Sequence, residues 1–287
     1  MTIRFALAAG MAAACVLSAS AQFRSSTNSV AIYATVADGS GRLSTDLQRG
    51  DFKVFDNGKE REITLFSSDP QPITVAIMLD MSGSMEGRFL KVRESTLRFI
   101  NSLVDGDRAQ IGSFGNEVAI SPLLTGDKEV LTRVVHEELW PMGSSPLWNA
   151  IDVAMTALAR EGGRRVILVL TDGADSCQLP RCVRFKDVES RALVEDFMIY
   201  AIGMDDLGLG GPIVGLTEKT GGGHFELKPG DDLGLTFARV AEELSHQYLI
   251  GFTPEILDGK EHRLEVRLGS PTMRARARQT YVATSRQ

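Results

Sequence analysis

The sequence predicts an α/β fold with a doubly wound, mostly parallel sheet, and a small flanking all-β domain formed by the N- and C-terminal segments. Near-continuous apolar runs at residues 73–79 and 166–170 are typical of strands buried on both faces of a parallel sheet. Strand and helix patterns alternate between about residues 73 and 253, as in doubly wound domains. Short β-rich runs broken by turn residues lie on both sides of this region.

The N-terminal β strands are expected between residues 29 and 66. Runs rich in β-branched and aromatic residues are separated there by the turns Asp38-Gly39-Ser40-Gly41 and Asp56-Asn57-Gly58-Lys59. This segment is too short to be very stable alone. We therefore expect some strands of the C-terminal part to pair with its edges. The candidate C-terminal strands are residues 248–252, 262–268 and 274–282.

Helices are expected between the strands of the central region. Residues 88–104 place apolar side chains on one stripe. Residues 146–160 begin with a proline in the first turn, which favours a helix start. The remaining predicted helices are 188–197 and 233–245, and the remaining predicted strands are 108–114, its hairpin partner 117–124, and 198–202.

These patterns divide the chain into four parts. They are a leader at residues 1–21, a small β-rich domain at 22–70, an α/β domain at 71–253 and a β segment at 254–287. The last part is expected to pack with the N-terminal β domain.

The first 21 residues have the pattern of a cleaved signal peptide. A short basic start is followed by an apolar run at residues 5–17 and an Ala-x-Ala site ending at Ala21. A buried helix is the alternative. The run is too short to span a bilayer comfortably, so we expect no membrane span in the mature chain. We expect export to the periplasm or the exterior, without lipid anchoring at Cys15, because Ala12-Ala13-Ala14 lacks the usual leucine.

Charge and cysteine content narrow the classes of function. The chain carries a formal net charge of −6 and no basic run, which disfavours nucleic-acid binding. Outside the leader only Cys177 and Cys182 remain, and an even pair in an exported protein favours a disulfide. A two-thiol metal site is the alternative, but the four histidines are scattered and form no metal-ligand pattern.

Two buried strands end in aspartates, and these are the candidate site. One strand runs into Asp80 and the other into Thr171-Asp172. Because the carboxyl ends of parallel strands lie along one edge of a sheet, both carboxylates should face the same crevice. Asp80 is followed by Ser82 and Ser84 in a tight loop before a helix. Carboxylates and hydroxyls are hard oxygen ligands, which favour Mg²⁺, Mn²⁺ or Ca²⁺ over zinc or copper.

Asp80-Met81-Ser82-Gly83-Ser84-Met85 resembles the metal-ion-dependent adhesion site of von Willebrand factor A domains. Thr171-Asp172-Gly173 is similar to the third loop of that site, and Gly143-Ser144-Ser145-Pro146-Leu147 to the second, with Ser145 where the family has Thr. The segments around 33–36, 51–54, 221–223 and 247–254 resemble the flanks of secreted A-domain proteins of Acidobacteria.

The resemblance implies a ligand set and a partner. Ser82, Ser84 and Ser145 would contact the metal directly, and Asp80 and Asp172 would act through water. Mg²⁺ is the expected ion. An open coordination position would take an acidic side chain of a protein or peptide partner with an exposed Asp or Glu. We therefore expect a metal-dependent adhesion or assembly module of the bacterial envelope or exterior.

Two other classes of function remain as alternatives. Asp80 at a strand end also resembles an aspartyl phosphatase nucleophile, which a metal would assist. Such enzymes carry a second Asp two residues on, where this chain has Ser82, and no nucleophile elbow, P-loop or dinucleotide pattern is present. We therefore expect no enzyme. The other alternative is an envelope scaffold in which the metal only stabilises the loops or the site does not function.

Overall fold

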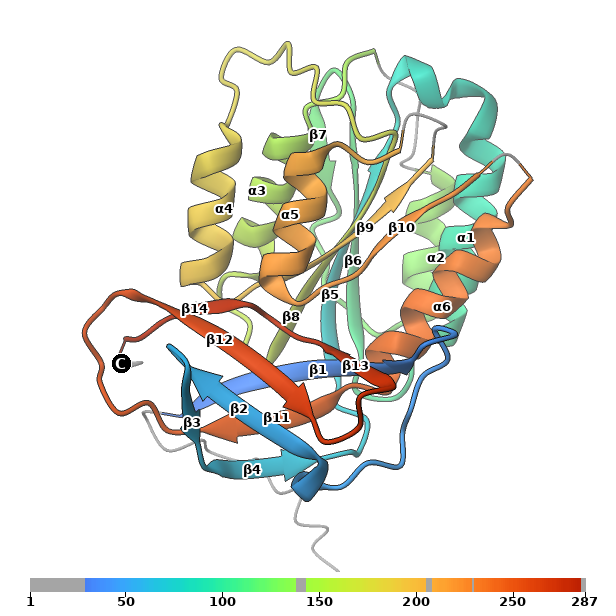
Figure 1. The fold of residues 1–287 in the computed structure, drawn as a ribbon. Helices are drawn as coiled ribbons and strands as arrows, with labels where there is room; N and C mark the ends of the chain where they lie inside the picture. Colours follow the sequence, from blue (N-terminus) through green and yellow to red (C-terminus); the bar gives the residue numbers. More distant parts are fainter. Residues whose placement is uncertain (1–28, 138–142, 205–207, 229, 285–287) are drawn as a thin grey trace, which may run out of the picture.

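The computed structural model describes residues 29–137, 143–204, 208–228 and 230–284, and the predicted leader lies outside them. Figure 1 shows two parts, an α/β domain above and a β domain below, the latter formed by segments from both ends of the described chain.

The α/β domain is built on a six-stranded sheet. All neighbouring strands are parallel except the last pair. Every residue of the central strand β5 is buried, as its apolar sequence requires of a strand covered on both faces. The strands in spatial order are β10 (His224–Glu226), β9 (Met198–Gly203), β8 (Arg164–Thr171), β5 (Ile73–Asp80), β6 (Arg108–Phe114) and β7 (Val118–Ile120).

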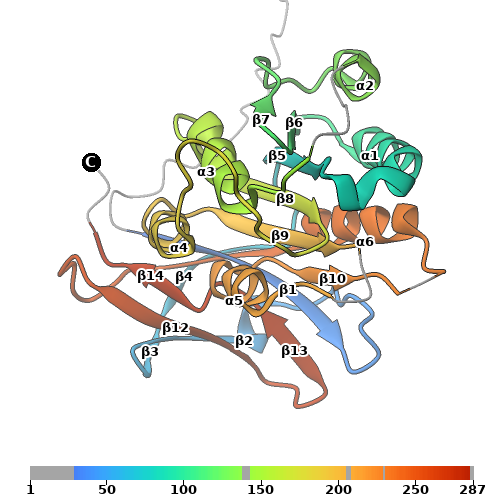
Figure 2. The same ribbon diagram turned by 90° about the horizontal axis from the view of Figure 1, so that it is seen from above.

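Helices cover both faces of this sheet (Figure 2). One face carries α1 (Phe89–Ser102), α2 (Lys128–Glu137) and α6 (Leu233–Ser245), and the other carries α3 (Leu147–Leu158), α4 (Phe185–Val194) and α5 (Gly211–Thr220). Each face buries its own apolar cluster, because alternate residues of each strand point to opposite sides. None of the described helices combines the length and apolar character needed to cross a bilayer.

The β domain consists of two four-stranded antiparallel sheets around a third apolar cluster. One sheet has the order β13 (Met273–Arg276), β1 (Val30–Asp38), β11 (Tyr248–Phe252) and β4 (Ile63–Ser67). The other has the order β14 (Thr280–Val282), β12 (Glu261–Leu268), β2 (Phe52–Asp56) and β3 (Lys59–Arg61). Short 3-10 helices precede β2 and α1, at η1 (Arg49–Asp51) and η2 (Gly83–Arg88).

The β domain lies across the edge of the large sheet where its parallel strands begin (Figure 1). At this junction the Arg164 guanidinium of β8 lies 5.1 Å from the centre of the Tyr33 ring of β1. The backbone N–H of Gln279 donates to the carbonyl of Lys219, at the end of α5. The opposite edge, where the parallel strands end, is left free of the β domain.

The predicted fold class is confirmed, with two corrections of detail. The strand β11 was among the C-terminal strands expected to pair with the N-terminal β segment, and it pairs with β1 and β4, so the predicted domain boundary at residue 253 falls after a strand of the β domain. Its apolar sequence indicates a buried strand and does not say which sheet buries it. Residues 274–282 were expected to form one strand, but they form β13 and β14, which pair with β1 and β12.

The sequence reasoning missed two helices and a short strand, β10. The helix α2 had a start signal in Asp127, whose carboxylate accepts the backbone N–H groups of Glu129 and Val130. The helix α5 had Pro212 in its first turn and Gly221 at its end, in the left-handed conformation with φ 81°. Their apolar stripes are short, and so the periodicity did not stand out.

Candidate metal centre

Three loops meet at the free edge of the large sheet, and each carries part of the predicted site. Asp80 ends β5 and leads into η2, Ser145 lies just before α3, and Thr171 ends β8. The strands β5 and β8 are parallel neighbours, with Leu79 opposite Leu170. This register places Asp80 beside Thr171.

Asp80 accepts hydrogen bonds from all three loops. Its Oδ2 accepts the hydroxyls of Ser145, at 2.9 Å, and Thr171, at 2.8 Å. Its Oδ1 accepts the backbone N–H of Ser82 at 2.9 Å. Asp80 is therefore the centre of the cluster.

The other predicted ligands continue the same chain of contacts. The Ser82 and Ser84 hydroxyls lie 3.0 Å apart, and the Ser84 hydroxyl donates to Oδ2 of Asp172. The structure thus brings Asp80, Ser82, Ser84, Ser145 and Asp172 into one hydrogen-bonded cluster.

The residues of the cluster differ in solvent exposure, from a buried side to an exposed one. Asp80 and Thr171 are fully buried, and Ser82 and Ser145 are almost so. Ser84 is exposed and Asp172 is half-buried. The site is therefore closed toward the sheet and open on the side of Ser84 and Asp172.

Burial raises the pKa of the Asp80 carboxyl, because taking a carboxylate out of water disfavours its charged form. The hydrogen bonds from Ser82, Thr171 and Ser145 act in the opposite direction and lower it. All of these donors are neutral. A cation beside Asp80 would offset the remaining cost of its burial.

Close backbone approach holds the three loops together. The N–H of Gly83 donates to the carbonyl of Gly143 at 3.1 Å. A side chain at position 143 would collide with Asn116, whose Oδ1 accepts the N–H of Ser144. Gly173 has φ 88°, and a Cβ there would lie 2.8 Å from the carbonyl oxygen of Gly208. Gly173 is therefore required by its backbone conformation and by the close approach of Gly208, and a side chain at position 143 would displace Asn116 from Ser144.

The residues present fit a hard divalent cation. Hydroxyl and carboxylate oxygens are the ligands that Mg²⁺ and Ca²⁺ prefer. In the described part of the chain, no three His, Cys, Asp or Glu side chains gather closely enough to hold an ion. Hydroxyl groups would therefore supply much of the ligand set here, as the serine-rich loop predicts.

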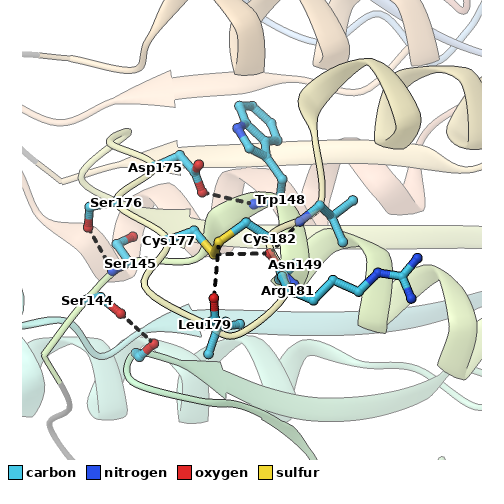
Figure 3. Close-up of a disulfide and its surroundings, with 12 residues drawn as sticks. Ser144, Ser145, Trp148, Asn149, Asp175, Ser176, Cys177, Leu179, Arg181 and Cys182 are labelled. Carbon is cyan, nitrogen blue, oxygen red and sulfur yellow. Dashed lines mark hydrogen bonds between the residues drawn. A yellow bond between two sulfur atoms is a disulfide. The ribbon is translucent and has the colours of Figure 1, made fainter.

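The two cysteines form the predicted disulfide, in the loop that follows Asp172. Cys177 and Cys182 are bonded, with their Cα atoms 6.0 Å apart. Figure 3 shows this bond beside the start of α3 and close to Ser145. Disulfides of this kind persist in oxidising compartments.

Some residues of the site were missed as participants by the sequence reasoning. Thr171 was noticed within the Thr-Asp-Gly triplet but given no role, although its hydroxyl bonds Asp80 directly. Asn116 fixes the second loop from the turn between β6 and β7, and no sequence signal pointed to it. Asp175 and Ser176 bond the backbone beside Ser145, and only the fold brings them there.

Comparison with known proteins supports the predicted resemblance to von Willebrand factor A domains. The family model for the von Willebrand factor type A domain matches residues 75–174, which include Asp80, Ser145 and Asp172. None of the curated proteins matches the chain.

Solved structures show the same fold. A von Willebrand factor type A protein from Catenulispora acidiphila has a TM-score of 0.53 and 14% identity, over 88% of this chain and 73% of that one. Proximal thread matrix protein 1 from the mussel byssus has a TM-score of 0.52 and 14% identity, over 66% of this chain and 51% of that one. Identities this low establish the fold alone. The resemblance to acidobacterial secreted proteins stays a prediction. Residues 75–174 of the chain thus match a von Willebrand factor type A domain.

Proposed function

We propose that this protein is a divalent-metal-dependent binding module that recognises an acidic side chain of a protein or peptide partner. The observation that carries the proposal is the cluster around Asp80. Three loops converge on a fully buried carboxylate whose hydrogen-bond donors, among the described residues, are all neutral hydroxyl or amide groups. A buried charge of this kind is costly unless a cation accompanies it.

In this proposal Ser82, Ser84 and Ser145 contact the metal directly, and Asp80 and Asp172 hold it through water. Mg²⁺ is the favoured ion, and Mn²⁺ and Ca²⁺ are the alternatives. Ligands that are mostly neutral leave the cation enough charge to attract a further carboxylate. The exposed side of the cluster, at Ser84 and Asp172, is where the partner's Asp or Glu would reach it.

A groove beside the cluster supports a binding role. It has a volume of about 310 Å³. One of its lining residues is Arg88, the last residue of the η2 helix that also carries Ser84. Met204 joins it to the site, because its N–H donates to the carbonyl of Thr171. A partner held by the metal would therefore meet this groove, which also contains the exposed Lys91 and Lys228.

We infer that the module works outside the cytoplasm and has no catalytic role. The Cys177–Cys182 bond supports export, because cytosolic thiols are usually kept reduced. Periplasmic or extracellular placement depends on the predicted signal peptide. Ser82, where aspartyl phosphatases carry a second Asp, supports binding over phosphoryl transfer.

Calorimetric titration of Mg²⁺, Mn²⁺ and Ca²⁺ into chelator-stripped protein tests the metal. We expect one site in the wild type and none in Asp80→Ala. The matched control is Asp69→Ala, which removes an exposed carboxylate from the linker between β4 and β5 and should leave binding unchanged. Absence of binding for all three ions in the wild type would refute metal binding by the free protein.

Partner recognition is tested with peptide libraries on immobilised protein, in Mg²⁺ and in chelator. We expect captured peptides to contain Asp or Glu, to be lost in chelator, and to be lost when that residue becomes Asn or Gln. Capture that persists in chelator would instead indicate a scaffold whose metal only stabilises the loops.

A further inference from the structure

The backbone of Ser145 is bonded on both sides by one residue of the disulfide loop. The Ser145 N–H donates to the Ser176 hydroxyl at 3.0 Å, and the Ser176 N–H donates to the Ser145 carbonyl at 2.8 Å (Figure 3). Ser145 is nearly fully buried, and its own hydroxyl points to Asp80 at 2.9 Å. Ser176 therefore fixes the peptide units from which this candidate ligand projects.

The next residue of the same loop caps the helix that follows Ser145. Pro146 precedes α3 and supplies no capping side chain. The first N–H groups of a helix need partners from outside it. Asp175 provides one, accepting the N–H of Trp148 at 3.4 Å, while the N–H of Leu147 donates to the Ser145 carbonyl at 3.0 Å. The start of α3 is thus held by a carboxylate from a different loop.

The far end of the loop is tied to the same helical turn. The Asn149 Oδ1 accepts the N–H of Val183 at 3.0 Å, and its Nδ2 donates to the carbonyl of Arg181 at 3.0 Å. The Cys177–Cys182 bond closes the segment between the two attachments. Because the bond restricts the arrangements open to the segment, both attachments stay in place together.

We propose that the loop from Asp175 to Val183 is a positioning device for Ser145, and that its disulfide sets the metal affinity of the site. The affinity claim rests on the proposed function. Asp175 and Ser176 touch the backbone of the second loop and not the predicted metal position, so they are positioning residues. Residues that orient metal ligands in this way commonly change metal affinity by about 10- to 100-fold when removed.

Two measurements on Ser176→Ala and Asp175→Ala test the proposal. The first is the Mg²⁺ dissociation constant, expected to rise about 10-fold. The second is hydrogen exchange in metal-free protein, expected to be faster for the Ser145 amide in Ser176→Ala and for the Trp148 amide in Asp175→Ala. Asp175→Asn keeps an acceptor and should restore slow exchange. The matched control is Gln178→Ala, an exposed residue within the disulfide ring, which should change neither quantity.

The disulfide is tested by Cys177→Ser/Cys182→Ser and by reversible reduction of the wild type. A dithiol supplies two electrons and two protons, the Sγ–Sγ bond becomes two thiols, and the reagent becomes a cyclic disulfide. We expect weaker Mg²⁺ binding after reduction and recovery after reoxidation. The reversibility separates the effect from a failure to fold.

The possible failures can be told apart. Unchanged amide exchange in both Ser176→Ala and Asp175→Ala would overturn the positioning role. Unchanged Mg²⁺ affinity after reduction would overturn the role of the disulfide. A lower melting temperature with unchanged affinity and exchange would show a purely structural loop. Lack of Mg²⁺ binding by the wild type would overturn the proposed function and the affinity claim, while amide exchange would still decide the positioning.

Discussion

Asp80 in the α/β domain and Asp56 in the β domain are equally buried, with 0% and 1% of their surface exposed, but their surroundings differ. Asp56 lies 3.2 Å from the Arg61 guanidinium and 2.8 Å from Nδ1 of His262. The neighbours of Asp80 are serine and threonine hydroxyls and a backbone amide. Asp56 has the cationic Arg61 as a partner, and within the described part of the chain Asp80 has only neutral donors.

The difference distinguishes a structural carboxylate from a candidate functional one. A buried charge is tolerated when an opposite charge and hydrogen bonds accompany it. Asp56 meets this condition within the β domain and joins β2 to β12 through His262. Asp80 has the hydrogen bonds but, among the described residues, no opposite charge, and burial raises its pKa. The unbalanced carboxylate is therefore where an external cation has most to contribute.

The largest expected effect is a loss of folding stability when Asp56 is removed from its cluster with Arg61 and His262. Asp56→Ala leaves Arg61 and His262 without their buried partner, and removal of one member of a buried pair costs about 3–5 kcal/mol. Urea unfolding would measure the loss in free energy of unfolding. The control Asp46→Ala removes an exposed carboxylate of the same domain and should cost little. A loss below about 1 kcal/mol for Asp56→Ala would show that the cluster is not a structural ion pair.

At Asp80 we expect a smaller effect, a gain in stability from Mg²⁺ that depends on this carboxylate. Mg²⁺ at 100 times its dissociation constant should stabilise the wild type by about 2.7 kcal/mol. Asp80→Asn should abolish this gain yet change metal-free stability by less than about 1 kcal/mol, because losing an unbalanced buried charge offsets weaker hydrogen bonds. Thermal unfolding with and without Mg²⁺ measures both. A strongly destabilised metal-free Asp80→Asn would contradict the contrast with Asp56.

The smallest expected effect is a pH dependence of folding stability that comes from Glu255, which pairs with Arg61 beside Asp56. Hydrogen bonds from Lys59 and Arg61 lower the pKa of Glu255 from 4.5 to about 2. A depressed carboxyl pKa stabilises the fold above pH 4.5, and this stabilisation is lost as the pH falls toward 2. The advantage of wild type over Glu255→Gln should therefore shrink across that range in urea unfolding at successive pH values. A constant difference would show that Glu255 does not titrate as a paired carboxylate.

The two domains also differ in how far the sequence predicted them. In the α/β domain, every described strand except β6 is followed by a helix, so local apolar runs and periodicity were enough to identify most elements. The Asp80 loop lies within six consecutive residues, and the strand ends that carry Asp80 and Asp172 had to share an edge in a parallel sheet. In the β domain, Val30 pairs with Phe252, and no local pattern specifies such a distant partner.

The sequence by itself determined the fold class, the apolar strands of the central sheet, the loops that carry the five candidate ligands and the cysteine pair. Periodicity and short-range motifs encode these features directly. The tertiary structure alone decided which strands β11 pairs with, that Asp56 meets His262, and that Asp175 and Ser176 hold the backbone around Ser145. Those contacts join residues far apart in the chain, and their geometry depends on how the elements pack, which no short stretch of sequence specifies.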